Sequence, residues 1–345
     1  MPVTHEAVPA AYGRLSELAD RTRIEGPWAS GAFASLADHG VLARLVPADC
    51  GGVKTTESAP SEPLEILTAT ARHCLTTALA LSQWAAAVQI MAAADLPVRQ
   101  QLLDGFASGR RCATIGISQL TTSRRHASRP PMVASRRDQW RLNGLCPWVT
   151  GADTVDVIVT GAVITEADAG YFVVERSASG VDVELPMRLV ALSGSRTSSV
   201  RFVDVQPVAM ISAERAGAPR GGGLATTAVA VGAALGSVDL LRGLASESSA
   251  PDLVDLADRL SEQCAAIAVS LADPATLVVD EHEDLRARAN QLVRRASTAA
   301  LMAAKGSGFI AGHPAGRAVS EAQFFTVWSN PPGVVRREIR YLTAE

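Results

Sequence analysis

The chain has 345 residues, of which 48% are hydrophobic and 19% are charged, and its formal net charge is -3 with a pI near 6.1. A chain of this length can bury a large core, but its charge balance offers no cationic surface for nucleic acid or an anionic membrane. The longest apolar runs, around Ala78 and Ala228, are alanine-rich and shorter than a membrane span, which predicts packed helices.

Three kinds of pattern follow one another along the chain. Residues 8–109 carry apolar side chains at steps of three and four, which predicts helices. Residues 112–209 hold short alternating runs between turn residues, which predict antiparallel strands at 140–142, 155–159, 171–174 and 200–205. After a linker at Gly221–Gly223, helical patterns return over residues 224–244, 253–271, 282–305 and 317–342.

This order of helices, strands and helices predicts an α+β fold. We expect an N-terminal helical domain (1–110), a middle antiparallel β domain (111–215) and a C-terminal four-helix bundle (216–345). The cysteines are odd in number and scattered, at Cys50, Cys74, Cys112, Cys146 and Cys264. They lack metal-ligand spacing, and the first residues contain no apolar stretch of the secretory kind, so we expect reduced thiols and a cytoplasmic location.

Five segments resemble, in chain order, landmarks of the acyl-CoA dehydrogenase family of flavoproteins. They are Leu36–Gly52, Leu102–Gly116, Trp140–Ala162, Val200–Val205 and Lys305–Arg317. No single segment is specific, but five in the right order are hard to obtain by chance, and together they cover most of the chain. The resemblance implies FAD as cofactor, an acyl or acyl-CoA-like substrate, and assembly as a homodimer or homotetramer.

The most informative segment runs from Leu142 to Ala152. Side chains at Trp148 and Thr150 share the same parity on an extended strand, so an indole and a hydroxyl are expected on one surface. The resemblance implies that Trp148, as a buried indole, walls the flavin and that Thr150 bonds near its reactive edge. It also implies that Ile117 and Ser118 contact the pyrimidine end of the flavin. The alternative is a core tryptophan beside an ordinary strand threonine.

Two further turns match the family pattern. Ser195 and Thr197 match a Ser-x-Thr turn that the family places near the phosphates of the cofactor or of coenzyme A, with Arg196 adding charge. Gly306 and Gly308 resemble a late glycine turn that passes close to the adenine dinucleotide of a neighbouring subunit, an approach that glycine permits. A polar turn and an ordinary helix C-cap are the respective alternatives.

The catalytic glutamate of the family has no counterpart. Its usual position falls on Ser329, and the other position used in the family lies within Thr226–Gly236, which contains no ionisable side chain. A serine hydroxyl cannot remove a weakly acidic C–H proton unless another base activates it. The catalytic base is therefore unknown, and the segment Ser329–Gly333 predicts a strong turn instead.

Two charged clusters in the sequence each allow more than one interpretation. Arg124 and Arg125 stand where the family meets its substrate. With Arg129 they are expected either to bind an anionic substrate or the phosphates of coenzyme A, or to form a solvated loop. The acidic stretch Asp280–Asp284, which contains His282, looks like a metal cluster. Five adjacent polar residues point around a helix rather than converge, so a solvated helix start is favoured and no metal is expected.

Three functions fit these patterns. The first is a flavin-dependent oxidoreductase that acts on an acyl thioester or a related substrate without the usual glutamate. The second is a non-catalytic partner subunit that completes the site of a paralogue in a heteromer. The third is a scaffold that kept the fold and lost the flavin, and the presence of Trp148, Thr150 and Ser118 argues mildly against it.

Overall fold

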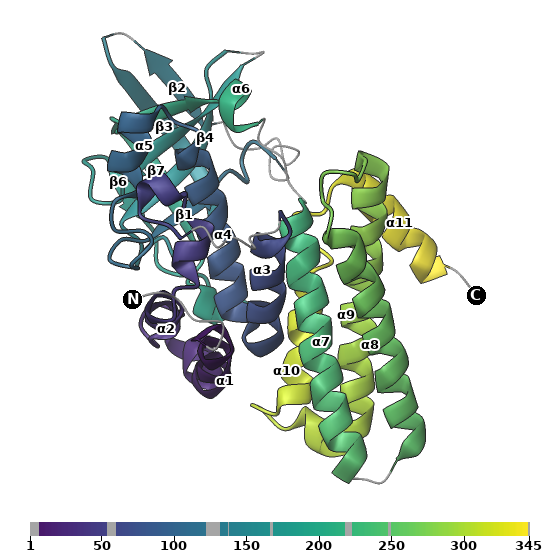
Figure 1. Ribbon diagram of the computed structural model, residues 1–345. Coiled ribbons are helices and arrows are strands. Elements are labelled where there is room, and N and C mark those ends of the chain that lie inside the picture. The colour runs from purple at the N-terminus through teal and green to yellow at the C-terminus, as the bar shows by residue number, and fades with distance from the viewer. Residues whose placement is uncertain are drawn as a thin grey trace. The chain divides into compact units, whose positions relative to one another are not determined.

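The computed structural model describes residues 7–53, 60–121, 132–136, 138–165, 168–217, 223–247 and 250–343 (Figure 1). Contacts divide the chain into two compact units, each of which is described by itself. The first unit comprises Met1–Thr56, Leu79–Leu189 and Ser193–Gly221. The second unit comprises Glu57–Ala78, Val190–Leu192 and Gly222–Glu345. The domain boundaries at residues 110 and 215 stay predictions.

The first unit combines helices with a sheet. Its helices are α1 (Ala7–Glu25), α2 (Ala32–Asp38), most of α4 (Leu75–Ala92), α5 (Leu96–Leu103) and α6 (Ala213–Ala216). Short 3-10 helices are η1 (Leu42–Leu45), η2 (Ala48–Cys50) and η4 (Ser193–Ser195). The start of helix α5 is determined by its local sequence. Asp95 is extended at the N-cap, and Pro97 lies in the first turn, where a missing N–H leaves no helical hydrogen bond unmade.

The sheet of the first unit contains eight strands among the described residues. They are β1 (Ala113–Gly116), β2 (Val133–Arg136), β3 (Trp140–Val149), β4 (Val157–Val163), β5 (Ala169–Glu175), β6 (Val181–Val183), β7 (Ser198–Val205) and β8 (Ala209–Ser212). Their order is β6-β7-β3-β2-β4-β5-β8, with β1 paired to β4. The runs at 140–142, 171–174 and 200–205 thus lie in β3, β5 and β7, and the run at 155–159 overlaps the start of β4.

The sheet is mixed rather than purely antiparallel. Strand β1 pairs with β4 in parallel, from Ala113 opposite Val157 to Gly116 opposite Thr160. Parallel neighbours need a long connection, and the chain supplies one because it passes through β2 and β3 before it returns to β4. Strand β4 is buried on both faces over most of its length, as its run of apolar and small residues requires.

The second unit is helical. Its helices are α3 (Glu62–His73), α7 (Leu224–Glu247), α8 (Pro251–Leu271), α9 (Val279–Ala304), α10 (Pro314–Phe324) and α11 (Pro332–Thr343). Figure 1 shows α7, α8 and α9 side by side, with α3 against α7. The prediction of one helix over 317–342 is wrong, because the chain breaks between α10 and α11. Pro331 and Pro332 explain the break, since a proline inside a helix lacks a donor and clashes with the preceding turn.

Helices α3 and α7 approach so closely that glycine is required. A Cβ atom at Gly232 would lie 2.1 Å from the backbone oxygen of Thr68, and one at Gly236 would lie 2.5 Å from that of Arg72. The contact is fastened by an ion pair in which Arg72 Nε lies 2.6 Å from Asp239 Oδ2. The small residues of α7 are therefore explained by helix packing within this unit.

Two helices, Leu75–Ala92 and Leu224–Glu247, are long and apolar enough to cross a membrane by length and composition. Within the most apolar 18 residues of each helix, 72% and 61% are buried inside the protein, respectively. Core helices of water-soluble proteins pass the same test, so burial is the better explanation of their composition.

Candidate functional site

The ends of β1 and β3 lie against each other. A Cβ atom at Gly116, the last residue of β1, would lie 2.9 Å from Val149 Cγ2 and 3.0 Å from Cys146 Sγ. The Ser118 hydroxyl, just beyond β1, lies 3.9 Å from Cys146 Sγ. The structure therefore brings the turn that carries Ile117 and Ser118 beside the end of β3, where the sequence places Trp148 and Thr150.

The environment of Trp148 differs from the prediction. The residue is 50% exposed, so the predicted buried indole is wrong. The pairing of β3 with β7 is irregular between Cys146 and Val149, and Pro147 has no N–H for the ladder, so simple alternation does not hold here. Thr150 follows the strand and is 8% exposed. An exposed indole next to a nearly buried hydroxyl suits a flat ligand at this edge.

Three hydroxyls form a chain at the same edge. The Ser195 hydroxyl lies 2.8 Å from that of Thr197, and the Thr197 hydroxyl lies 3.4 Å from that of Thr150. Ser195 is fully buried and Thr197 is 6% exposed. A contact of Ser195 and Thr197 with cofactor phosphates stays a prediction, and in this structure both hydroxyls have protein partners.

The turn after Thr150 is held on two sides. Gly151 has a φ of 66°, and a Cβ atom there would lie 2.2 Å from Cη2 of the Trp28 ring. On the other side, Gly151 N–H donates to the backbone oxygen of Ser195 at 2.9 Å. Sequence reasoning missed Trp28, because a glycine signals an unusual backbone angle but not which ring covers it.

The positive charge of Arg196 is paired with the neighbouring carboxylate of Asp153. Its Nε donates to both carboxylate oxygens of Asp153, at 2.9 and 3.1 Å, and this hydrogen bonding raises the pKa of Arg196. The expectation that Arg196 adds charge for an anion must therefore include Asp153, which neutralises much of that charge.

Gln119 anchors the turn that carries Ile117 and Ser118. Its Nε2 donates to the backbone oxygen of Gly161 at 2.7 Å and, more weakly, to that of Gly116 at 3.3 Å. These bonds tie the turn to β4 across a buried position, since Gln119 is only 7% exposed. The sequence offered no signal for this role beyond a polar residue after an apolar strand.

The turn that carries Ser329 lies in the second unit, between α10 and α11. Ser329 has a φ of 53°, which is unusual for a residue other than glycine. Arg286 of α9 is fully buried beneath this turn, and its Nη2 donates to the backbone oxygen of Trp328 at 3.0 Å. Its guanidinium carbon lies 5.6 Å from the ring centroids of both Phe325 and Trp328. Burial lowers the pKa of Arg286 to about 9, and the nearby Glu338 acts in the opposite direction.

Amide side chains complete this support. Asn290 of α9 and Asn330 of the turn both donate to the backbone oxygen of Phe325, at 3.0 and 3.1 Å. Glu338 of α11 accepts a short hydrogen bond from Asn290 and a bond of 3.1 Å from Arg294. Glu338 is 7% exposed, so this acid serves the network and is not an available base.

The acidic start of α9 is engaged in ion pairs and capping. Arg337 pairs with both Asp280 and Glu283, while Glu281 accepts the backbone N–H of Val278 at 2.8 Å. No group of three or more metal-ligating side chains occurs in the part of the chain that the structure describes. The stretch Asp280–Asp284 therefore has a structural explanation.

The predicted glycine turn forms a 3-10 helix, η5 (Lys305–Phe309), in the second unit. A Cβ atom at Gly308 would lie 2.5 Å from Leu301 Cδ1, whereas one at Gly306 would meet nothing within 4 Å. Packing explains Gly308, and the contact of both glycines with a cofactor stays a prediction. Arg124, Arg125 and Arg129 lie outside the described residues.

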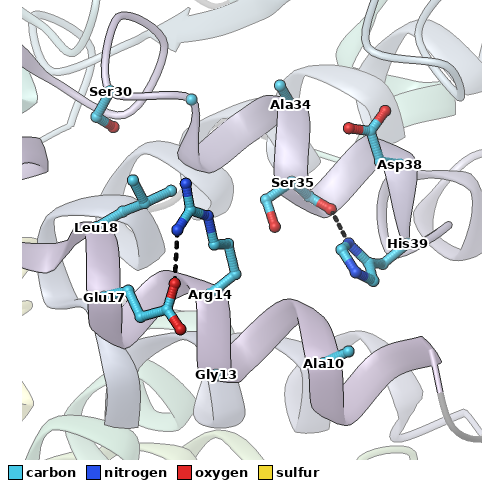
Figure 2. Close-up of a pocket in the computed structure, with 11 residues that line it drawn as sticks. Ala10, Gly13, Arg14, Glu17, Leu18, Ser30, Ala34, Ser35, Asp38 and His39 are labelled. Carbon is cyan, nitrogen blue, oxygen red and sulfur yellow. Dashed lines mark hydrogen bonds and ion pairs between the residues drawn. The ribbon is translucent and has the colours of Figure 1, made fainter.

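A groove of about 550 Å³ lies between α1 and α2 in the first unit (Figure 2). Figure 2 shows Arg14 and Glu17 pointing toward each other. They form an ion pair of 2.5 Å, and His39 Nδ1 lies 2.7 Å from the backbone oxygen of Ser35. None of the predicted site residues lines this groove. Arg14 and Glu17 of this groove pair with each other, whereas the buried Ser35 hydroxyl has no hydrogen-bond partner among the described residues.

Comparison with known proteins identifies the fold. No family model matches the chain, and no curated protein matches it in sequence. Among solved structures, glutaryl-CoA dehydrogenase with glutaryl-CoA aligns at a TM-score of 0.79 and 14% identity, covering 100% of this chain and 97% of that one. KijD3 with FMN and a dTDP-sugar aligns at 0.72 and 18% identity, covering 99% and 94%.

A third solved structure, an FAD-dependent dehydrogenase, aligns at a TM-score of 0.72 and 14% identity, covering 100% of this chain and 99% of that one. At these identities the likeness shows the fold alone. The chain has the acyl-CoA dehydrogenase fold, which confirms the resemblance drawn from the sequence and the predicted fold class. This fold carries flavin-dependent enzymes with different substrates.

Proposed function

We propose that this chain is a flavin-dependent oxidoreductase that binds FAD and acts on an acyl thioester or a related substrate without the usual glutamate base. The observation that carries the proposal is the end of β3, where the 50% exposed Trp148 stands two residues before the Thr150 hydroxyl. A ring that can stack and a hydroxyl that can bond are what a flat heteroaromatic cofactor needs.

The residues fit an isoalloxazine in a second respect. Gly116 lets β1 approach β3, so Ser118 and Thr150 come from two neighbouring segments of one edge. When bound there, a flavin supplies a two-electron acceptor. The protein would stack Trp148 on the ring and offer hydroxyl groups to its polar atoms, as the resemblance implies.

The chemistry cannot rely on the two base positions of the family. Ser329 has no carboxylate, and the segment Thr226–Gly236 has no ionisable side chain. Glu338 is bound to Asn290 and Arg294. We therefore propose a substrate whose oxidation needs no carboxylate from these positions, with the substrate or another group accepting the proton.

The visible absorption spectrum of the purified protein tests the proposal. A flavin spectrum, with FAD identified by mass spectrometry after release, supports it. FMN in place of FAD would correct the cofactor. A colourless protein that stays colourless and shows no binding when titrated with FAD and FMN would contradict the proposal.

A second candidate is a non-catalytic partner subunit. The observation in its favour is that both base positions lack a carboxylate, as expected of a chain that leaves proton removal to a paralogue. Co-expression with a relative that has the catalytic glutamate separates the two candidates. Flavin that binds only in the mixed complex would favour the partner subunit.

We further propose a homodimer or homotetramer located in the cytoplasm. The second unit exposes large apolar side chains close together in sequence, with Met302, Phe309 and Ile310 at 66%, 84% and 67% exposure. Large apolar side chains exposed together are typical of interfaces. The five cysteines are free, which suits a reducing compartment. Light scattering after gel filtration measures the assembly.

A further inference from the structure

We infer that Ser195 and Thr197 form a hydroxyl relay that directs the proton of the Thr150 hydroxyl toward a hydrogen-bond acceptor on the edge of a bound flavin. The inference rests on the proposed function, because the flavin supplies the acceptor. It gives Ser195 and Thr197 a positioning role through Thr150, in place of a contact with phosphates.

The relay follows from two distances. The Ser195 and Thr197 hydroxyl oxygens are 2.8 Å apart, an ordinary distance for a strong bond between hydroxyls. The Thr197 and Thr150 oxygens are 3.4 Å apart, which is a longer and weaker contact. The three groups come from η4, from the residue before β7 and from the residue after β3.

A count of protons sets the direction of the relay. Three hydroxyls carry three protons, and two contacts between them use only two. The spare proton lies on Thr150 or Ser195 when both bonds run in one direction, or on Thr197 when both neighbours donate to it. Ser195 and Thr197 are 0% and 6% exposed, and neither hydroxyl has another acceptor among the residues that the structure describes. A buried donor without an acceptor costs free energy, so the spare proton belongs on Thr150.

The arrangement is held by the backbone around it. A Cβ atom at Gly194 would lie 2.3 Å from the backbone oxygen of Thr22, so η4 packs tightly against the end of α1. Gly151 N–H binds the Ser195 backbone oxygen at 2.9 Å, which joins the turn after Thr150 to η4. Because both ends of the relay are fixed, the Thr150 hydroxyl is oriented before a ligand arrives, and its orientation costs little on binding.

Substitutions of Thr197 test the relay. Thr197→Val removes the central hydroxyl at similar size, Thr197→Ser keeps it, and Ser195→Ala removes the buried end. Ser198→Ala is the matched control, because the Ser198 hydroxyl is equally buried but has no partner among the described residues. Each protein is titrated with FAD, and the dissociation constant, the visible spectrum and the midpoint potential of the bound flavin are measured, with melting temperature as a check on folding.

We expect Thr197→Val to weaken flavin binding about two- to tenfold and to shift the flavin spectrum and potential. Thr197→Ser should restore wild-type values, Ser195→Ala should move the same quantities in the same direction, and Ser198→Ala should leave them unchanged. Thr150→Val combined with Thr197→Val should be no worse than Thr150→Val alone, because the relay acts only through Thr150.

The outcomes separate the two proposals. A wild-type protein that binds flavin, with Thr197→Val and Ser195→Ala indistinguishable from it in spectrum and potential, would overturn the relay and leave the proposed function standing. A wild-type protein that binds no flavin would overturn the proposed function and the relay with it. If Thr197→Val does not fold, Ser195→Ala decides the matter alone.

Discussion

The end of β3 and the turn that carries Ser329 are the two places where the acyl-CoA dehydrogenase resemblance expects chemistry, and they use their polar groups differently. At the end of β3, half of the Trp148 residue is exposed, and in the proposed relay the Thr150 hydroxyl has a proton to spare. Around the Ser329 turn, the side chains of Asn290, Asn330 and Glu338 all bind the protein itself. The atoms left without a partner among the described residues, Arg286 Nε and Nη1 and Asn290 Oδ1, are buried.

This difference in how the polar groups are used indicates which region can bind a ligand. A group that already has a good protein partner must lose it before it can serve a ligand, whereas an unused donor or an exposed ring can bind at no such cost. The β3 edge therefore has the means to hold a cofactor. The turn that carries Ser329 forms a structural joint between α9, α10 and α11.

The largest effect is expected where the structural joint is broken. Glu338→Ala removes the acid that accepts hydrogen bonds from Asn290 and Arg294, and it leaves the buried Arg286 without a nearby negative charge. Breaking a buried ion pair in this way should lower the free energy of unfolding by about 3–5 kcal/mol. Urea denaturation followed by circular dichroism measures this change.

The matched control for Glu338 is Asp284, another acid paired with an arginine on α9. Asp284 lies 3.7 Å from Arg288, and its side chain is 48% exposed. Asp284→Ala should change stability by less than about 0.5 kcal/mol. If the two variants cost the same, the network under the Ser329 turn contributes little and the contrast between the two regions is wrong.

A smaller effect is expected at the β3 edge. Gly151→Ala places a Cβ atom against the Trp28 ring at a φ of 66°, and we expect a loss of about 2–3 kcal/mol. Gly31→Ala separates the two causes, because Gly31 has a φ of 87° but nothing lies within 4 Å of its added Cβ. That control should lose only about 1–2 kcal/mol. Equal losses would mean that Trp28 does not clamp the turn.

Local pattern predicted most of the fold and only part of the site. Alternation located β4 and β5, and the three- and four-residue steps located α7 to α9. Local pattern could not show that β1 lies parallel to β4, because pairing partners are chosen by the whole sheet. It also could not show that Asn290 reaches Glu338, 48 residues further along the chain. Trp148 was misjudged because a register shift next to a proline interrupts the alternation.

Trp148→Ala tests whether the end of β3 binds a ligand, because it should change flavin affinity more than protein stability. Because half of this residue is already exposed, the free energy of unfolding should fall by less than about 1 kcal/mol. Flavin affinity should fall about two- to tenfold through lost stacking, and Trp148→Phe should retain most of it. Fluorescence titration with FAD measures both variants. Unchanged affinity and spectrum in Trp148→Ala would remove this residue from the site.

The reactivity of two buried thiols measures local unfolding in the two units separately, without any substitution at either thiol. Cys146 lies at the β3 edge and Cys264 lies on α8, and burial raises the pKa of each thiol to about 11. At pH 8 roughly one thiol in a thousand is then the reactive thiolate, so iodoacetamide should label neither in the native protein. Cys50, which is only partly buried, should label first.

Labelling in rising urea then tests whether the joint under the Ser329 turn stabilises its own unit. In Glu338→Ala, Cys264 should become reactive at a lower urea concentration than in the wild type, because the lost network belongs to the second unit. Cys146 should keep its wild-type midpoint, since its packing against Gly116 is untouched. Mass spectrometry of peptides labelled at each urea concentration reads both sites in one sample. A parallel shift of both cysteines would show that the two units unfold as one cooperative body, and the two regions could not then be compared by stability alone.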